Sequence, residues 1–225
     1  MKAIDWAITK EVDIISMSWA ADLEVSSDDE EKLSSALNKA MNKHKIPTFC
    51  ANPDKGRGYT TNETYPYKAH PDKIFCIGAE TSSGSQWRKI DPNDKSAHFY
   101  LPGVDLGIPV HAREGKDQPP GKWEKYSGSS LSCALAAGLA AMILHIAKVC
   151  EVSNEDWKKL KTREGMKAAF EKIDVTDGWL PVRKLFDLDS LRKGNDESKK
   201  EALKNDVVDW IIGKKAKAPW ELAGS

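Results

Sequence analysis

The stretch Tyr126–Ile143 reads YSGSSLSCALAAGLAAMI, a polar turn that runs directly into small and aliphatic residues. Ser127, Gly128, Ser129 and Ser130 form the turn, and the residues after it have the composition of a helix. Unpaired N–H groups and the dipole at a helix start favour negative charge, so the turn predicts a serine placed for acyl transfer. Because the segment is apolar all round, we expect a helix at Leu131–Lys148 buried in the centre of an α/β domain. An ordinary N-capping loop before a core helix would explain the same serines.

Composition bounds the chain to one substantial domain, or one domain and a tail, because 225 residues with 40% hydrophobic side chains can bury a core. Lys and Arg together number 34, as do Asp and Glu, so no net field points to nucleic acid or to a basic partner. The longest apolar run, Leu135–Ile143, is far short of the roughly 20 residues that cross a bilayer. We therefore expect no membrane span, and the charged segment Met1–Lys10 is no signal peptide.

The four cysteines stand singly in the sequence, without the spacing of metal ligands. They are Cys50, Cys76, Cys133 and Cys150. We expect free thiols, mostly buried, and neither a metal nor a cofactor. Free thiols without a signal peptide favour a cytoplasmic location.

Apolar runs alternate with helical patterns, which predicts a mostly parallel sheet covered by helices. Ala3–Ile8 has helical spacing, and Ser27 with Glu30 forms a capping box for a helix to about His44. A charged amphipathic segment at Asn154–Phe170 is also predicted to be helical. The polar run Thr81–Lys95 predicts a loop or hairpin. The predicted strands lie near Ile14, Phe49, Phe75 and Ile108.

Residues 128–138, GSSLSCALAAG, resemble the signature GTSMASPHVAG of the subtilisin-like serine proteases, with four identical positions. The resemblance implies that Ser130 is the nucleophile and that Ser129 replaces the usual threonine. It also implies that Gly138 is the closing glycine. The sequence departs from the signature at Cys133, Ala134 and Leu135.

Other segments between residues 3 and 147 follow the order of the same family. AIDWAI and VDIISMSW resemble its helix and strand before the substrate cleft, which implies substrate binding by Ser18, Trp19 and Ala20. Cys50-Ala51-Asn52 resembles its Ala-Gly-Asn motif, which implies that Asn52 donates to the oxyanion and that Ala51 borders the substrate. Trp19 as a packing residue and Asn52 as a turn former remain alternatives.

Two further matches extend the resemblance. Tyr65-Pro66 resembles the family's Tyr-Pro segment, which implies a cis peptide bond there. Tyr100–Val104 resembles its Ala-Pro-Gly-Val turn. Beyond these two, Gly178–Val182 is a weak match to the family's late Gly-Leu-Ile-Asn-Val stretch.

The resemblance implies a three-layer subtilisin-like α/β fold with a mostly parallel sheet that is incomplete at its N-terminus. Residues 1–188 are predicted to form the C-terminal part of the peptidase domain. Residues 189–225 are predicted to form a charged tail, in which Val207–Ile212 has the composition of a short helix; a solvated tail and a docking helix both remain open.

The triad Asp and His of such a protease precede the nucleophile in the chain and should lie upstream of Ala3. None of the five histidines has the expected context. They are His44, His70, His98, His111 and His145.

Three functional hypotheses follow from the sequence. The first is a serine-type endopeptidase acting on a peptide or protein substrate, in which an upstream segment completes the triad. The second is a degenerate family member that works as a protein-binding or scaffold module. The third, an unrelated α/β ligand-binding domain, has little support because no GxGxxG or Walker motif is present. None of them involves nucleic acid or a membrane.

Overall fold

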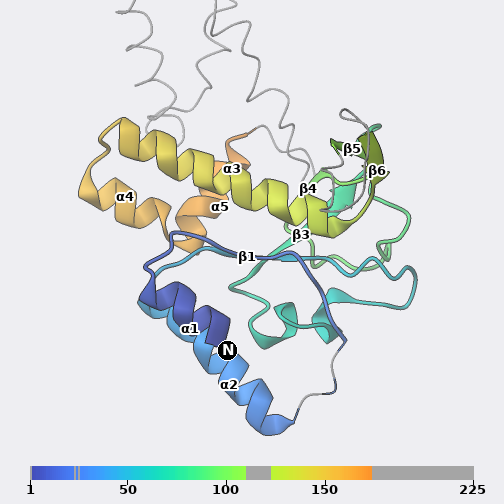
Figure 1. Ribbon diagram of the computed structural model, residues 1–225, viewed down its shortest axis with the longest axis horizontal. Helices are drawn as coiled ribbons and strands as arrows, with labels where there is room; N and C mark the ends of the chain where they lie inside the picture. The colour runs from blue at the N-terminus through green and yellow to red at the C-terminus, as the bar shows by residue number, and fades with distance from the viewer. Residues whose placement is uncertain (1, 23, 25, 110–122, 174–225) are drawn as a thin grey trace, which may run out of the picture.

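The computed structural model describes residues 2–22, 24, 26–109 and 123–173. At its centre is a sheet with the strand order β1-β2-β3-β4 (Figure 1). These strands are β1 (Ile15–Met17), β2 (Thr48–Ala51), β3 (Phe75–Glu80) and β4 (Phe99–Pro102). Each neighbouring pair is parallel, so the four carboxyl ends lie at one edge of the sheet. The predicted α/β class with a mostly parallel sheet is confirmed.

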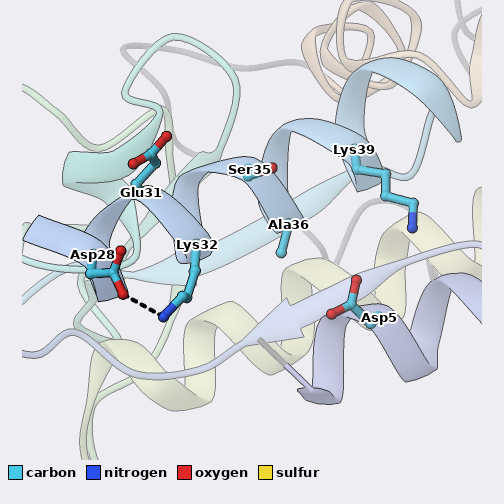
Figure 2. A pocket seen from close by; sticks show the side chains of 7 residues that line it. All are labelled: Asp5, Asp28, Glu31, Lys32, Ser35, Ala36 and Lys39. Carbon is cyan, nitrogen blue, oxygen red and sulfur yellow. Dashed lines mark hydrogen bonds and ion pairs between the residues drawn. The ribbon is translucent and has the colours of Figure 1, made fainter.

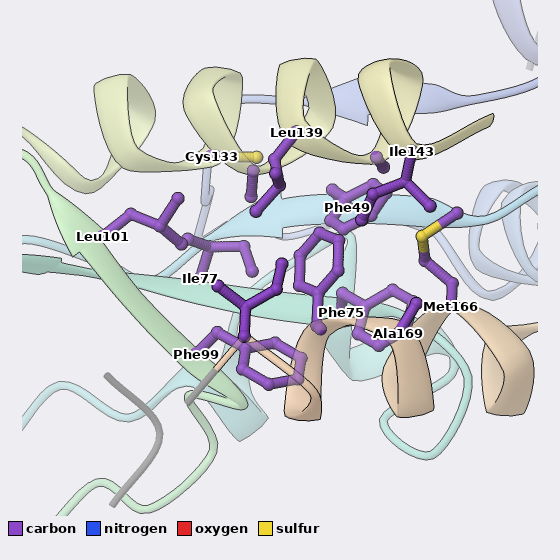
Figure 3. Close-up of a cluster of buried hydrophobic side chains, with 14 of the residues drawn as sticks. Phe49, Phe75, Ile77, Phe99, Leu101, Cys133, Leu139, Ile143, Met166 and Ala169 are labelled. Atoms are coloured by element: carbon purple, nitrogen blue, oxygen red, sulfur yellow. The ribbon is translucent and has the colours of Figure 1, made fainter. Parts of the chain in front are cut away.

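One face of the sheet packs against three helices, α3 (Ser129–Val149), α4 (Asn154–Leu160) and α5 (Arg163–Glu171). Figure 3 shows aromatic side chains from three strands meeting this layer. The ring centroids of Phe49 and Phe75 are 4.9 Å apart, and those of Phe99 and Phe170 are 5.2 Å apart. Aromatic pairs at such distances add to the stability that burial alone provides. Phe170 thereby fixes α5 to the sheet.

The opposite face of the sheet is covered by α1 (Lys2–Thr9) and α2 (Ser27–Asn38) (Figure 1). Successive residues of a strand point to opposite faces, so Phe49 and Ala51 face α3 while Cys50 belongs to the α1 and α2 layer. Both faces are therefore buried, which explains the continuous apolar runs. Short single-turn segments complete the fold: η1 (Lys39–Lys43), η2 (Thr61–Glu63) and η3 (Tyr67–Ala69).

The start of α2 differs from the prediction by one residue. Ser26, rather than Ser27, is the N-cap, and its hydroxyl accepts a hydrogen bond from the Asp29 N–H at 3.2 Å. The N-cap side chain satisfies an N–H three residues later, so two adjacent serines offer two registers for the same motif. Both candidates are serines, so the local backbone geometry, and not the residue type, decides that Ser26 is the N-cap of α2.

The prediction for the last strand of the parallel sheet was wrong. β4 occupies that place, whereas β5 (Leu106–Pro109) pairs in antiparallel fashion with β6 (Trp123–Tyr126). The chain turns between β4 and β5 at Asp105, which has a φ of 54°, and leaves the sheet there. The apolar run at residues 106–109 is typical of a strand but does not specify its partner.

The helical segment predicted at Asn154–Phe170 divides into α4 and α5. Thr162 caps α5 by accepting a hydrogen bond from the Gly165 N–H at 3.0 Å. The two helices approach so closely that a Cβ atom on Gly165 would collide with the Lys159 carbonyl oxygen. The sequence pattern is amphipathic across the break because both helices bury residues against the same core, among them Leu160 and Phe170.

Helix α3 is buried on one face only, which corrects the expectation of an all-round buried helix. Its sheet-facing residues, such as Ala136 and Ala140, are fully buried, whereas Leu135 and Val149 are 42% and 52% exposed. Within the described residues, α3 is the one helix long and apolar enough to cross a membrane by length and composition, and a soluble core helix passes the same test. Its packing on four strands is that of a core helix.

Two smaller expectations are confirmed: Tyr65-Pro66 is a cis peptide, and all four cysteines are thiols outside disulfides, three of them buried and Cys150 half-buried. Several predictions lie outside the described residues. These are the roles of His111, the match at Gly178–Val182, the domain boundary at residues 188 and 189, the tail at 189–225 and the helix around Val207–Ile212.

Candidate active site

The serine-rich turn lies at the carboxyl edge of the sheet, where it begins α3. Gly128 is the N-cap of α3 and carries no capping side chain, and its N–H donates to the Gly103 carbonyl at 2.7 Å. Ser130 follows in the first helical turn with an exposed side chain. The first N–H groups of a helix have no intrahelical partners and attract negative charge. This turn can therefore present a hydroxyl nucleophile beside backbone donors.

Two buried serines flank Ser130 and fix the turn to the sheet. The Ser129 hydroxyl accepts from the Ala79 N–H at 3.1 Å, and the Ser132 hydroxyl donates to the Leu101 carbonyl at 2.9 Å. Both serines have no exposed surface. Their hydrogen bonds reach β3 and β4, so the ends of two strands hold the first turn of α3 in place.

Asp54 joins the same turn from the loop after β2. Its Oδ1 accepts from the Ser129 hydroxyl at 2.6 Å, and its Oδ2 accepts from the Ser129 N–H at 2.7 Å. Asp54 thus caps α3 from another part of the chain, which the N-cap glycine cannot do itself. Burial raises the pKa of the Asp54 carboxyl, although the two bonds from Ser129 and the charge of Lys89 act in the opposite direction.

Asn52 lies at the same edge of the sheet, directly after β2, but its side chain is 2% exposed and already bonded. Its amide nitrogen donates to Thr61 Oγ1 at 2.8 Å and to Asp94 Oδ2 at 3.3 Å. Its nitrogen also lies 3.8 Å from the Cys76 sulfur, which belongs to the sheet face opposite α3. The role of Asn52 as oxyanion donor stays a prediction and requires the amide to leave these partners.

The Asn52 partners belong to a buried network that holds the loop after β2. Burial pulls the pKa of Asp94 upward, but hydrogen bonds from Thr61 and Ser96 outweigh it and lower the pKa overall. An ionised Asp94 therefore anchors Thr61 and the Asn52 amide together. The Asn52 side-chain oxygen has no partner and is buried.

The predicted substrate segment, Ser18 to Ala20, directly follows β1, whose end lies against the first turns of α3. The Ser16 hydroxyl is 3.2 Å from the Ser18 hydroxyl and 3.8 Å from the Cys133 sulfur, which links the end of β1 to α3. Trp19 is 43% exposed, and Ser18 and Ala20 are partly exposed. Ala51 is 3% exposed and belongs to the hydrophobic core, so its side chain is not available to a ligand.

The histidines in the described part of the chain have other partners or lie far along the helices. His98 Nδ1 accepts from the Cys76 N–H at 3.0 Å, and its Nε2 lies 2.8 Å from an Arg163 nitrogen. Burial first, then the charges of Arg163 and Lys167, lower the pKa of His98 to about 4. His70 Nε2 lies 2.8 Å from the Ser34 carbonyl oxygen. His44 ends η1, and His145 lies about four turns from Ser130.

No group of three or more His, Cys, Asp or Glu residues suited to a metal ion occurs among the described residues. A hollow does lie between α1 and α2, lined by Asp28, Lys32 and five other residues (Figure 2). Lys32 and Asp28 form an ion pair of 2.6 Å there, and both side chains are largely exposed. This hollow lies in the layer on the opposite face of the sheet from α3, so it is separate from the serine turn.

Sequence reasoning missed Asp54, because Asn52-Pro53-Asp54 has the composition of a turn. Two signals point to Asp54: it follows a buried strand, and an acid near a helix N-terminus stabilises that helix. Strand alternation gives a separate signal, which concerns Asn52. Because Phe49 and Ala51 face α3, the next residue, Asn52, should point away from it.

An open parallel sheet with a serine turn at its carboxyl edge is the arrangement of α/β proteins that place ligand sites at the ends of their strands. The model of the subtilase family (peptidase S8) matches residues 1–179. The chain belongs to the subtilase family of serine peptidases. This confirms the resemblance inferred from residues 128–138.

Individual relatives agree with this assignment. Subtilisin E of Bacillus subtilis (strain 168) and subtilisin of Bacillus pumilus are each 26% identical over 144 residues, which is 64% of this chain. The chain spans only 34% and 46% of the length of these two relatives. Among solved structures, the patellamide maturation protease PatA has a TM-score of 0.57 and 17% identity, covering 86% of this chain and 68% of that chain. The similarity to PatA shows the fold.

Proposed function

We propose that this chain carries the nucleophile-bearing part of a serine endopeptidase, with Ser130 as the nucleophile. The observation that supports it is the exposed Ser130 hydroxyl in the first turn of α3, held at the carboxyl edge of the sheet by its buried neighbours. The Ser130 oxygen would bond to the carbonyl carbon of a peptide. The carbonyl oxygen would take up negative charge beside the N–H groups that begin α3.

The proton of the Ser130 hydroxyl must pass to a base during this attack. The four described histidines are placed elsewhere, so we assign the base and its orienting carboxylate to an upstream segment. Ser18, Trp19 and Ala20 follow the end of β1, which Ser16 links to α3, and would border the peptide on one side of the nucleophile. Without a base the residual catalysis of a triad enzyme is about 10³–10⁴-fold over water, a magnitude known for subtilisin itself.

A fluorophosphonate probe, which forms a covalent bond with activated serines, tests the proposal. We expect feeble labelling of the 225-residue chain and strong labelling when it is co-expressed with the sequence that precedes it in its gene. Ser130→Ala should abolish the labelling, whereas Ser127→Ala should leave it intact. Ser127 is the matched control because its hydroxyl is also exposed, three residues away, and only accepts from the Asp105 N–H at 2.9 Å.

The competing candidate is a degenerate subtilase domain that binds protein without hydrolysis. The buried hydrogen bonds of the Asn52 amide favour it, because they occupy the donor that the family's catalysis requires. Labelling that survives Ser130→Ala would exclude Ser130 as the nucleophile. Silence of the co-expressed protein would favour the binding module.

A further inference from the structure

The space in front of Ser130 is bordered by a carboxyl group rather than by an amide. A Cβ atom built on Gly128 would lie 3.0 Å from the Ser130 hydroxyl oxygen and 3.5 Å from Asp54 Oδ2. Both oxygens therefore face the same point beside the turn. The absence of a side chain at Gly128 leaves that point open.

The loop after β2 holds Asp54 in this position from several sides. The Gly56 N–H donates to the Lys89 carbonyl at 2.7 Å, and the Gly58 N–H donates to Asp91 Oδ2 at 2.7 Å. The carboxyl itself bonds twice to Ser129. Asp54 is thus placed by a fixed loop, as a residue that acts on a reacting group should be.

We propose that Asp54, in its neutral form, is the side chain that donates a hydrogen bond to the oxyanion formed when Ser130 attacks a carbonyl group. The inference rests on the proposed function and names a different donor from Asn52. A proton on Oδ2 leaves that oxygen able to accept the Ser129 N–H through a lone pair while its O–H points to the oxyanion. No proton is transferred in this contact; Asp54 only donates a hydrogen bond.

The charge state of Asp54 decides whether it helps or hinders the reaction. An ionised carboxylate has no proton to donate and repels a developing oxyanion, whereas a neutral carboxylic acid held in a poorly solvated site donates well. Burial favours the neutral form by raising the Asp54 pKa. The two hydrogen bonds from Ser129, and then the charge of Lys89, favour the ionised form, but burial outweighs them and the pKa of Asp54 is raised.

The two forms have different roles at one position. The ionised form caps α3 through Ser129, which stabilises the resting turn. The neutral form keeps Oδ2 beside the open point at Gly128, where its O–H can donate a hydrogen bond to the oxyanion. Activity should therefore fall as pH rises through the Asp54 pKa, in addition to any rise with pH that comes from deprotonation of the base.

The test is the pH profile of fluorophosphonate labelling, measured on the chain co-expressed with its upstream sequence. Asp54→Asn has the shape of aspartate and donates at every pH, so it should remove the decline at high pH. Asp54→Ala should lower the labelling rate by about 10²–10³, the magnitude known for loss of the side-chain donor in subtilisin. Asn52→Ala, which breaks the buried network, should lower thermal stability but keep the decline with pH.

The outcomes separate this inference from the proposed function. Labelling that depends on Ser130, with the same pH profile for the wild type and Asp54→Asn, overturns the role of Asp54 alone. Labelling that survives Ser130→Ala, or no labelling at any pH, overturns both. A carboxyl-carbon NMR titration of the 225-residue chain tests the same inference without an activity assay. The pKa of the Asp54 carboxyl should lie above the usual aspartate range, and a pKa within or below that range overturns the role of Asp54 as a neutral donor.

Discussion

Replacement of Gly103 by alanine should destabilise the protein by pushing apart the contacts that hold the serine turn. The added Cβ atom would collide with the Ser132 hydroxyl and lie 2.7 Å from the Ala79 Cβ atom. Overpacking of this kind costs about 1–3 kcal/mol. A displaced Ser132 hydroxyl also loses the hydrogen bond that its one proton shares between two carbonyls at the end of β4, worth about 1 kcal/mol. We expect a total loss of roughly 2–4 kcal/mol.

The matched control is Gly138→Ala, because a Cβ atom there would meet nothing within 4 Å. Gly138 lies in the interior of α3, where alanine is favoured over glycine by about 0.5–1 kcal/mol, so this variant should be more stable than the wild type. Urea unfolding followed by circular dichroism measures both changes. A Gly103→Ala variant within 0.5 kcal/mol of the wild type would show that the turn is not clamped as described.

The remaining predictions concern the core and pH. Phe170→Ala should cost about 3–5 kcal/mol in urea unfolding because the ring is fully buried among three other phenylalanines, and a loss below 1 kcal/mol would mean that α5 is not part of the core. The folded pKa of His98, about 4, lies below its unfolded value near 6.5. Stability should therefore fall as pH drops from about 6.5 to 4, since the unfolded chain takes up a proton that the folded chain refuses. His98→Asn should flatten this slope in unfolding measured at several pH values; an unchanged slope would assign it to another group.

The elements that sequence predicted best are those whose pattern has a single explanation. The runs around Phe49 and Phe75 are buried on both faces and became β2 and β3. The run around Ile14 became β1, in which Ile15 and Met17 are buried and Ser16 is exposed. β4 was harder to predict because Phe99–Pro102 is short and ends in proline, which resembles a turn. The strand at Ile108 exists, but its partner is set by the turn at Asp105, which hydrophobicity does not encode.

In the candidate site, too, the residues that depend on local sequence were predicted and those that depend on distant partners were not. Ser130 follows from a turn and helix that are local in sequence. The partners of Asn52 and Asp54 are not local, because Thr61, Asp94 and Ser129 reach them from three other segments. The resemblance to the family's Ala-Gly-Asn motif favoured the Asn52 amide as donor, and only the packing of those segments shows that Asp54 borders the serine turn.

The three buried thiols are chemical reporters of unfolding, because a reagent reaches them only when the core opens. Cys50, Cys76 and Cys133 have no exposed surface, and Cys50 and Cys76 are register partners on β2 and β3. The hydrogen bond from Cys76 and burial raise the pKa of Cys50, and burial raises that of Cys133 to about 11. Thiolates are the reactive form, so the raised pKa values keep Cys50 and Cys133 unreactive, and burial shields all three sulfurs from reagents until the core opens. Half-buried Cys150, at the end of α3, is the thiol that an alkylating reagent reaches first. Alkylation of the other three thiols then measures how often the core opens.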